Sequence, residues 1–263
     1  MNRTEKIQHL NQLLLDEMPE YRSQASQFPP EDAAQRRLLR SLMNVRPPMP
    51  LKAEFLQMQD EVLSAEREEK GVVDAAALPD VPGHPGIAIW QGDITRLAAD
   101  AIVDADNSAL LGCFCPCHGC IDNAIHSAAG LQLRDECNDI MQRQGCPEPN
   151  GRAKLTKGYN LPARYVLHTV GPIVRGRVTE QNRAELASCY RSCLELAAKK
   201  GLTSVAFCCI STGEFHFPNQ EAAEIAVKTV TDFLRHDTSI RKVIFNVFKD
   251  IDGAIYRDLL RAD

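Results

Sequence analysis

Apolar runs and helical patterns alternate along the chain from about residue 86 onward. The apolar runs are short and rich in β-branched residues, which is typical of strands buried in a sheet. Because the segments between them have helical spacing, helices can cover both faces of that sheet, and we predict a three-layer α/β domain. The expected strands are 87–90, 101–104, 165–170, 204–210 and 243–248, and the expected helices cover about 120–143, 180–200, 219–235 and 252–261.

The first 85 residues differ from the rest in composition. They hold nine of the fifteen prolines and none of the ten cysteines. Three stretches in this region place apolar residues at helical spacing, and prolines separate the stretches. We therefore predict a helical N-terminal extension over residues 1–85 and the α/β domain over residues 86–263. The apolar residues of the three stretches are Leu10, Leu13 and Leu14; Leu38, Leu39 and Leu42; and Leu51, Phe55, Met58 and Val62.

Charge and cysteine content narrow the function classes. The net charge of −5 argues against a broad nucleic-acid-binding surface. No apolar run approaches the roughly 20 residues that span a bilayer, and the polar N-terminus has no apolar signal core. We therefore expect a cytoplasmic protein with no membrane or nucleic-acid partner. Cysteines in the cytosol are metal ligands or buried thiols, and we assign Cys189, Cys193, Cys208 and Cys209 to the core.

Four cysteines and one histidine lie between positions 113 and 120. Thiolate and imidazole groups are the ligands that zinc prefers. The rest of the chain has no second CxxC or HxxxH arm, so this cluster alone offers few ligands to close a coordination sphere. An open position on zinc is typical of a catalytic site. The carboxylate of Asp122 follows directly after the cluster.

Four loops with unusual residues each follow an expected strand. Ligands of such sheets bind outside the carboxyl ends of the strands, so we expect these loops to line one cleft. Ser211, Thr212 and Gly213 have the composition of a phosphate cradle, although ordinary turns share it. The loops are 91–95, 105–108 with the cysteine cluster, 171–172 and 211–215.

Several residues near these loops have a second interpretation. Asp93 could cap a helix that starts at Ile94, and Asn107 could close a turn onto its own backbone. His126 lies four residues after Asp122 and shares its helix face. A lone buried histidine is more often a core residue than a ligand, and the same holds for His168 in its expected strand.

Taken together, these motifs resemble the macrodomains, a family of ADP-ribose-binding proteins with an α/β/α fold and a mixed central sheet. The resemblance extends from about residue 90 to residue 250 and is strongest to the zinc-dependent bacterial branch of MacroD-type protein-ADP-ribose hydrolases. The segments that carry it are Gly92-Asp93-Ile94-Thr95, Asn107-Ser108, Gly112 through His126, Gly151 through Pro162, His168 through Pro172, Ile210-Ser211-Thr212-Gly213 and Val247-Phe248.

The metal motif of that branch falls on Cys113, His118 and Cys120. The resemblance thus implies one zinc ion per chain, with Cys115 and Cys117 as neighbours and Cys117 as the reserve ligand. Zinc would supply the nucleophile or polarise an oxygen of the substrate.

The resemblance also implies roles for the other residues of the cleft. Asp122 would orient or deprotonate the attacking water or bind the ribose, and Asn107 would hold the hydroxyls of the distal ribose. Asp93 and the Ile94 backbone would bind the adenine, on which Phe248 would stack. The diphosphate and distal ribose would be wrapped by Ser211, Thr212, Gly213, Glu214 and Phe215.

The implied reaction is hydrolysis of mono-ADP-ribose from a protein side chain, and the implied side chain is a carboxylate. The implied substrate is a lipoyl-carrier protein that a sirtuin-type ADP-ribosyltransferase modifies. Two other functions fit the same motifs: a non-catalytic ADP-ribose reader whose zinc is structural, and a redox sensor in which oxidation of the cysteines releases zinc.

The chain departs from the family at one strand end. Asp104-Ala105-Asp106-Asn107 stands where the family usually has Asn-Ala-Ala-Asn. Two added acids near an anionic ligand should weaken binding unless they are paired, protonated or turned away. We expect Asp104 to accept hydrogen bonds from local backbone N–H groups.

Overall fold

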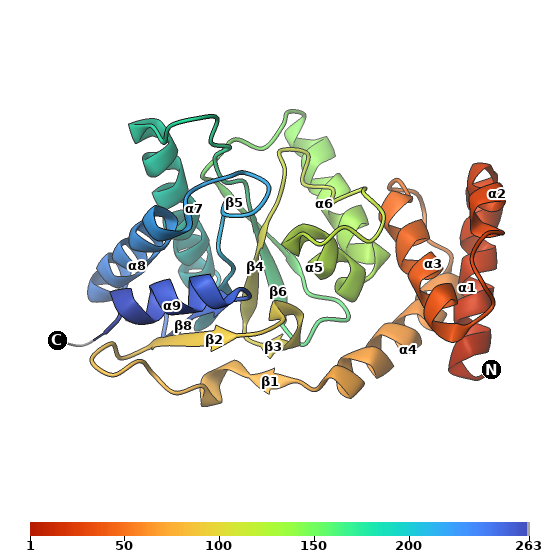
Figure 1. Ribbon diagram of the computed structural model, residues 1–263, viewed down its shortest axis with the longest axis horizontal. Coiled ribbons are helices and arrows are strands. Elements are labelled where there is room, and N and C mark those ends of the chain that lie inside the picture. Colours follow the sequence, from red (N-terminus) through yellow and green to blue (C-terminus); the bar gives the residue numbers. More distant parts are fainter. Residues whose placement is uncertain (262–263) are drawn as a thin grey trace.

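A six-stranded mixed sheet forms the centre of the computed structural model, which describes residues 1–261. The strand order is β2-β8-β7-β4-β6-β5, and every neighbouring pair is parallel except β5 and β6. A separate short pair, β1 and β3, lies beside the sheet (Figure 1). The strands are β1 (Val73–Asp74), β2 (Ile87–Gln91), β3 (Leu97–Ala98), β4 (Ala101–Ala105), β5 (Ala153–Lys157), β6 (Tyr165–Thr169), β7 (Ser204–Phe207) and β8 (Lys242–Val247).

Helices cover both faces of this sheet, which confirms the predicted three-layer α/β fold. Helices α5 and α6 lie on one side, and α7, α8 and α9 lie on the other (Figure 1). Among residues 1–261, no helix has both the length and the apolar character needed to cross a membrane. The helices are α5 (Ile121–Ala129), α6 (Leu131–Gln144), α7 (Glu180–Lys199), α8 (Asn219–His236) and α9 (Asp250–Leu259).

Two predicted elements differ from the structure, and strands β1, β3 and β5 were not expected. The expected helix over 120–143 is two helices, because Gly130 has a left-handed φ of 101° that ends α5 and starts α6. The expected strand over 204–210 stops at Phe207; residues 208–210 remain apolar because they pack under the cleft as a loop. Strand β5 was not expected because it has no continuous apolar run. Its sequence alternates apolar and polar residues, as in a half-exposed edge strand.

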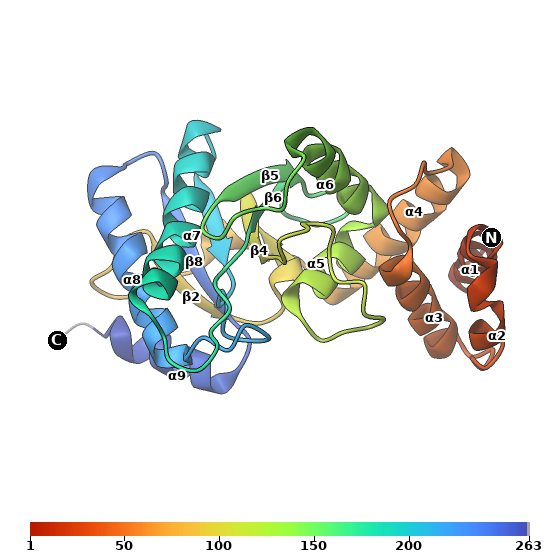
Figure 2. The ribbon, with the colours of Figure 1, turned by 90° about the horizontal axis from the view of Figure 1, so that it is seen from above.

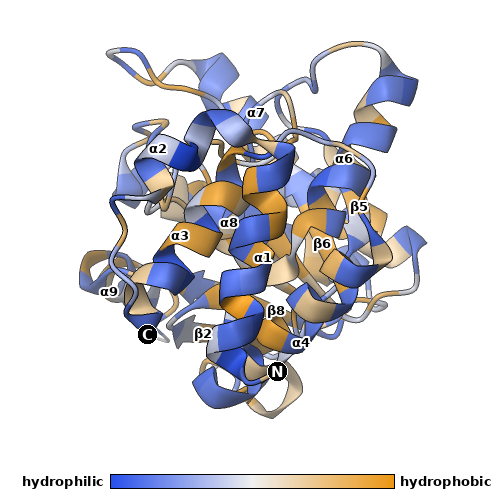
Figure 3. Cartoon of the chain, turned by 90° about the vertical axis from the view of Figure 1, so that its right-hand side faces the viewer, coloured by the Kyte–Doolittle hydropathy of each residue, from blue (hydrophilic) through white to orange (hydrophobic). Residues whose placement is uncertain are grey.

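The N-terminal helices lie at one end of the molecule, against α5 and α6 (Figures 1 and 2). The apolar residues that the sequence places at helical spacing form a second hydrophobic core there, which Leu131 of α6 joins. Viewed from this end, α1 and α3 carry orange hydrophobic residues among blue hydrophilic ones, as amphipathic helices do (Figure 3). The elements are α1 (Arg3–Glu17), α2 (Arg22–Ala25), α3 (Asp32–Val45) and α4 (Ala53–Lys70).

One buried arginine joins this helical layer to the α/β domain. Arg134 of α6 is 3% exposed, and its guanidinium donates to the carbonyl oxygens of Met43, Asn44 and Arg46 at 2.6–3.1 Å. These carbonyls lie at the C-terminal end of α3, where a cation also complements the helix dipole. The Nε of Arg134 donates to the carbonyl oxygen of Leu111, just before the cysteine cluster. Burial lowers the pKa of Arg134 to about 10, so it remains charged at neutral pH.

Replacing this arginine tests its role. Arg134→Met should lower the free energy of unfolding by about 2–4 kcal/mol, because it leaves several buried carbonyls without a donor. Urea unfolding followed by circular dichroism measures the loss. Arg143→Met, on the exposed surface of the same helix, is the matched control and should change stability by less than about 0.5 kcal/mol. Equal effects of the two changes would contradict this role.

Candidate active site and metal centre

A cleft of about 650 Å³ opens at the carboxyl ends of the parallel strands. The loops after β2, β4, β6, β7 and β8 all contribute to it, because parallel strands deliver their carboxyl ends to one edge of the sheet. Every residue that the sequence marked for the site lines this cleft: Asp93, Ile94, Asn107, Cys113, His118, Cys120, Asp122, Ser211, Thr212, Gly213, Glu214, Phe215 and Phe248.

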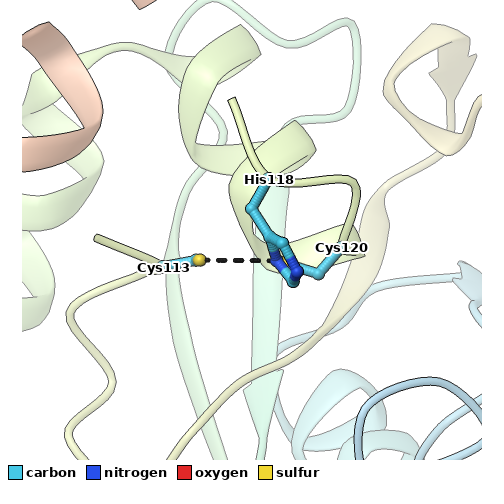
Figure 4. A group of neighbouring side chains, drawn as sticks. All are labelled: Cys113, His118 and Cys120. Atoms are coloured by element: carbon cyan, nitrogen blue, oxygen red, sulfur yellow. Dashed lines mark hydrogen bonds between the residues drawn. The ribbon is translucent and has the colours of Figure 1, made fainter. Parts of the chain in front are cut away.

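Cys113, His118 and Cys120 form a compact group of metal-ligating side chains (Figure 4). Their ligand atoms lie within 4.8 Å of one another, with Cys113 Sγ 3.7 Å from His118 Nδ1. The other ring nitrogen of His118 is 3.6 Å from a carboxylate oxygen of Glu214, the kind of partner that orients a ligating histidine. Two thiols and one imidazole that are partly open to a cleft fit zinc with a free coordination position.

The remaining two cysteines of the cluster face elsewhere. Cys115 is exposed, and the Cys117 sulfur lies 3.3 Å from Ser41 Oγ and 3.6 Å from the Arg37 carbonyl of α3. Cys117 also donates its backbone N–H to Asn44 Oδ1 at 2.9 Å. The cysteine loop is therefore seated on the helical extension, a contact that the sequence did not indicate.

Asp122 lies in the first turn of α5 at the bottom of the cleft. Cys120 caps this helix, since its sulfur accepts from the N–H of Asn123 at 3.4 Å. Asp122 is buried, and one of its oxygens is 3.5 Å from His126 Nε2. Burial, with the nearby carboxylates of Asp106 and Asp104, raises the pKa of Asp122 well above its ordinary value. Such an acid can exchange a proton nearer to neutral pH than an exposed aspartate.

Two residues of the cleft also make the local bonds that the sequence allowed. Asp93 caps the short helix Ile94–Arg96, where one of its oxygens accepts from the backbone N–H and the hydroxyl of Thr95. Asn107 accepts from the N–H of Ala109 at 3.0 Å and so closes its own turn. Both bonds from Thr95 end on the same oxygen of Asp93, so the second carboxylate oxygen of Asp93 stays available at the cleft.

The 211–215 loop has the features of an anion cradle. Ser211 has a left-handed φ of 65°, which is uncommon for a non-glycine residue, and its buried hydroxyl has no partner in the part of the chain described. A side chain at Gly171 would bring its Cβ within 2.0 Å of that hydroxyl. Within residues 1–261, the backbone N–H groups of Gly213, Glu214 and Phe215 donate to no protein acceptor.

The structure corrects two predictions and adds further residues to the cleft. Asp104 was expected to accept from backbone N–H groups, yet both of its oxygens lack any such partner among the described residues. Cys209 is half-buried and lines the cleft, whereas Cys189, Cys193 and Cys208 are buried as predicted. Gly171 lines the cleft as its loop predicted, and the structure adds Asn246, Lys249 and Asp252, which lie from the end of β8 to the first turn of α9.

Comparison with known proteins agrees with this geometry. The macro domain model matches residues 103–226. A protein-ADP-ribose hydrolase of Treponema medium is 50% identical over 262 residues, which is 99% of this chain and 100% of that protein. The chain belongs to the macrodomain protein-ADP-ribose hydrolase family.

Further relatives extend the comparison. The protein-ADP-ribose hydrolase of Staphylococcus aureus strain Mu50 is 51% identical to this macrodomain protein over 227 residues, covering 86% of this chain and 85% of that one. The Trypanosoma brucei macrodomain in complex with ADP-ribose superimposes with a TM-score of 0.67 at 32% identity, covering 84% and 95% of the two chains. A variant of the Oceanobacillus iheyensis macrodomain with ADPR gives 0.61 at 38% identity, covering 66% and 91%.

The contact between the macrodomain loop and the extension is testable at Asn44. Asn44 also donates to Ser127 of α5 at 3.0 Å, so Asn44→Ala removes one buried and one partly buried hydrogen bond. We expect a loss of about 1–3 kcal/mol in unfolding free energy and faster hydrogen exchange of the Cys117 amide relative to amides of β4. Asn11→Ala, a buried amide that bonds only within the extension, is the control. Unchanged Cys117 exchange in Asn44→Ala would contradict the contact.

Proposed function

We propose that this chain is a zinc-dependent hydrolase that removes mono-ADP-ribose from modified protein side chains. The observation that carries the proposal is the placement of the Cys113, His118 and Cys120 group in one cleft with an anion cradle and the buried acid Asp122. The names of the relatives support the hydrolase activity. The zinc requirement rests on the ligand group of this chain.

The two ends of the cleft suit the two ends of ADP-ribose. Phe248 is 75% exposed at the rim, where its ring is free to stack on adenine, and the unused oxygen of Asp93 can accept from the adenine amino group. The Ile94 backbone would assist there. The free N–H groups of 213–215 with the hydroxyl of Ser211 would hold the diphosphate. The Thr212 hydroxyl donates to the Cys209 carbonyl at 2.9 Å and would have to turn to join them.

The distal ribose then reaches the cysteine loop. Cys113, His118 and Cys120 would hold zinc, which would act as a Lewis acid in the cleft. The side-chain N–H₂ of Asn107 would hold a ribose hydroxyl. Asp122 would orient a water molecule and take its proton as the water attacks the ribose C1, while the bond from C1 to the protein side chain breaks and the freed group leaves as a carboxylate.

The substrate class extends the proposal by family resemblance. The linkage would be an ester to a carboxylate side chain, the modified protein a lipoyl-carrier protein, and the source of the modification a sirtuin-type ADP-ribosyltransferase. An ester suits this site because its leaving carboxylate needs no proton.

Metal removal tests the zinc requirement. Full-length protein is incubated with a mono-ADP-ribosylated acceptor, with and without chelator, and free ADP-ribose is measured. We expect chelation to lower the rate by about 100-fold or more and added zinc to restore it. Cys113→Ala, His118→Ala and Cys120→Ala should match the chelated protein. Cys115→Ala, an exposed thiol of the same loop, should keep full activity. If the metal-free protein releases ADP-ribose at an unchanged rate, the proposed zinc requirement is wrong.

Asp122 distinguishes a hydrolase from a reader. Asp122→Asn should lower kcat by about 10²–10⁴-fold, because it removes the proton acceptor, while binding of free ADP-ribose by calorimetry changes little. Phe248→Ala should instead weaken ADP-ribose binding by about 1–3 kcal/mol through lost stacking on the base. If wild-type protein binds ADP-ribose tightly but never releases it from an acceptor, the chain is a reader whose metal is structural.

A further inference from the structure

A cluster of buried ionisable side chains lies directly beneath the floor of the cleft. It consists of Asp104 and Asp106 from the end of β4, His168 from β6 and His126 from α5, and none is more than 5% exposed. Asp104 and His168 are direct partners in the parallel register of β4 and β6, and α5 packs against β4. One ligand atom from each of the four residues lies within 4.8 Å of all the others.

Most polar atoms of this cluster have no partner. Within residues 1–261, both oxygens of Asp104, one oxygen of Asp106 and both ring nitrogens of His126 make no hydrogen bond. Each unpaired buried polar group costs about 1–3 kcal/mol, and a bare carboxylate costs more. Within residues 1–261, the hydrogen bond inside the cluster joins His168 Nδ1 and Asp106 Oδ2 at 2.8 Å, and an additional group can satisfy the remaining atoms.

The distances within the cluster suit a metal ion as that group. Asp104 Oδ2 lies 3.9 Å from His126 Nε2 and 4.0 Å from His168 Nδ1. Zinc bonds to nitrogen and oxygen are about 2.0–2.2 Å, so two ligands of one ion lie no more than about 4.4 Å apart. One water molecule can donate only two hydrogen bonds, whereas three carboxylate oxygens here lack a donor.

The surroundings of the cluster resemble the outer shell of a metal site. His168 Nε2 lies 2.8 Å from the buried hydroxyl of Thr156, which can accept its N–H and so leave Nδ1 directed at the two aspartates. Asp106 lines the cleft, so the cluster lies directly beside it. No thiol is needed in this ligand set, and two carboxylates with two imidazoles suit first-row divalent metals such as Mn²⁺ or Zn²⁺.

We propose that Asp104, Asp106, His126 and His168 bind a second divalent metal ion beneath the cleft, separate from the Cys113, His118 and Cys120 group. This ion would tie the end of β4 to α5 and β6. The inference goes beyond the proposed hydrolase and does not depend on it, because metal binding is measured without substrate.

Metal content separates the two groups of ligands. Full-length proteins are loaded with Zn²⁺, passed through a desalting column and measured by inductively coupled plasma mass spectrometry. We expect about two ions per chain in wild type and about one in Cys113→Ala/Cys120→Ala. Asp104→Asn/Asp106→Ala should also hold about one ion. This second double variant has the residues that the resembled family usually carries there, so it should fold; thermal unfolding checks this. Asp252→Asn, another buried acid of the cleft, should bind as wild type does.

Manganese gives an independent measurement in the wild-type fold. Mn²⁺ prefers oxygen and nitrogen ligands to thiolates, so paramagnetic resonance should show protein-bound Mn²⁺ in wild type and a loss of about tenfold or more in affinity in Asp104→Asn/Asp106→Ala. The proposal is overturned if folded Asp104→Asn/Asp106→Ala binds Zn²⁺ and Mn²⁺ as wild type does. It is equally overturned if wild type holds no metal beyond that bound by the cysteine group.

Discussion

Strand β4 pairs in parallel with both β6 and β7, and this central position determines where the residues of the cleft can lie. Its carboxyl end releases Asp106 and Asn107 into the cleft, and the chain then continues directly into the cysteine loop. A slip of one residue in the β4–β6 register would turn Asp104 away from His168 and move the start of that loop. The binding loops of the other strands meet this one because all parallel strands end at the same edge.

The helical extension contributes to the site by holding the cysteine loop in place. The cysteine loop is held between α3, through Asn44, and α6, where the Arg134 guanidinium lies 4.0 Å from the centre of the Phe114 ring. Arg40 of α3 also donates to the side chain of Asn123, which in turn donates to the carbonyl of Cys115. These contacts hold the loop that carries Cys113, His118 and Cys120 in a fixed position. This frame gives the extension a physical role in positioning the ligands.

Local patterns in the sequence were enough to predict the layers, the three long helices of the extension and four of the loops that line the cleft. They were enough because buried parallel strands read as apolar runs and place their following loops at one edge. They did not reveal the break at Gly130, which depends on one backbone angle, or the edge strand β5, which is too polar to stand out. The contact of Cys117 with Ser41 and the pairing of Asp104 with His168 join distant segments, so no local pattern could indicate them.

The most direct test of the account is a crystal structure of the full chain with ADP-ribose, recorded at the zinc absorption edge. The account predicts an anomalous peak about 2.3 Å from the sulfurs of Cys113 and Cys120, with the distal ribose beside it and the adenine at Phe248. A structure in which these thiols bind no metal, or in which the ribose lies at the Phe248 end, would contradict it.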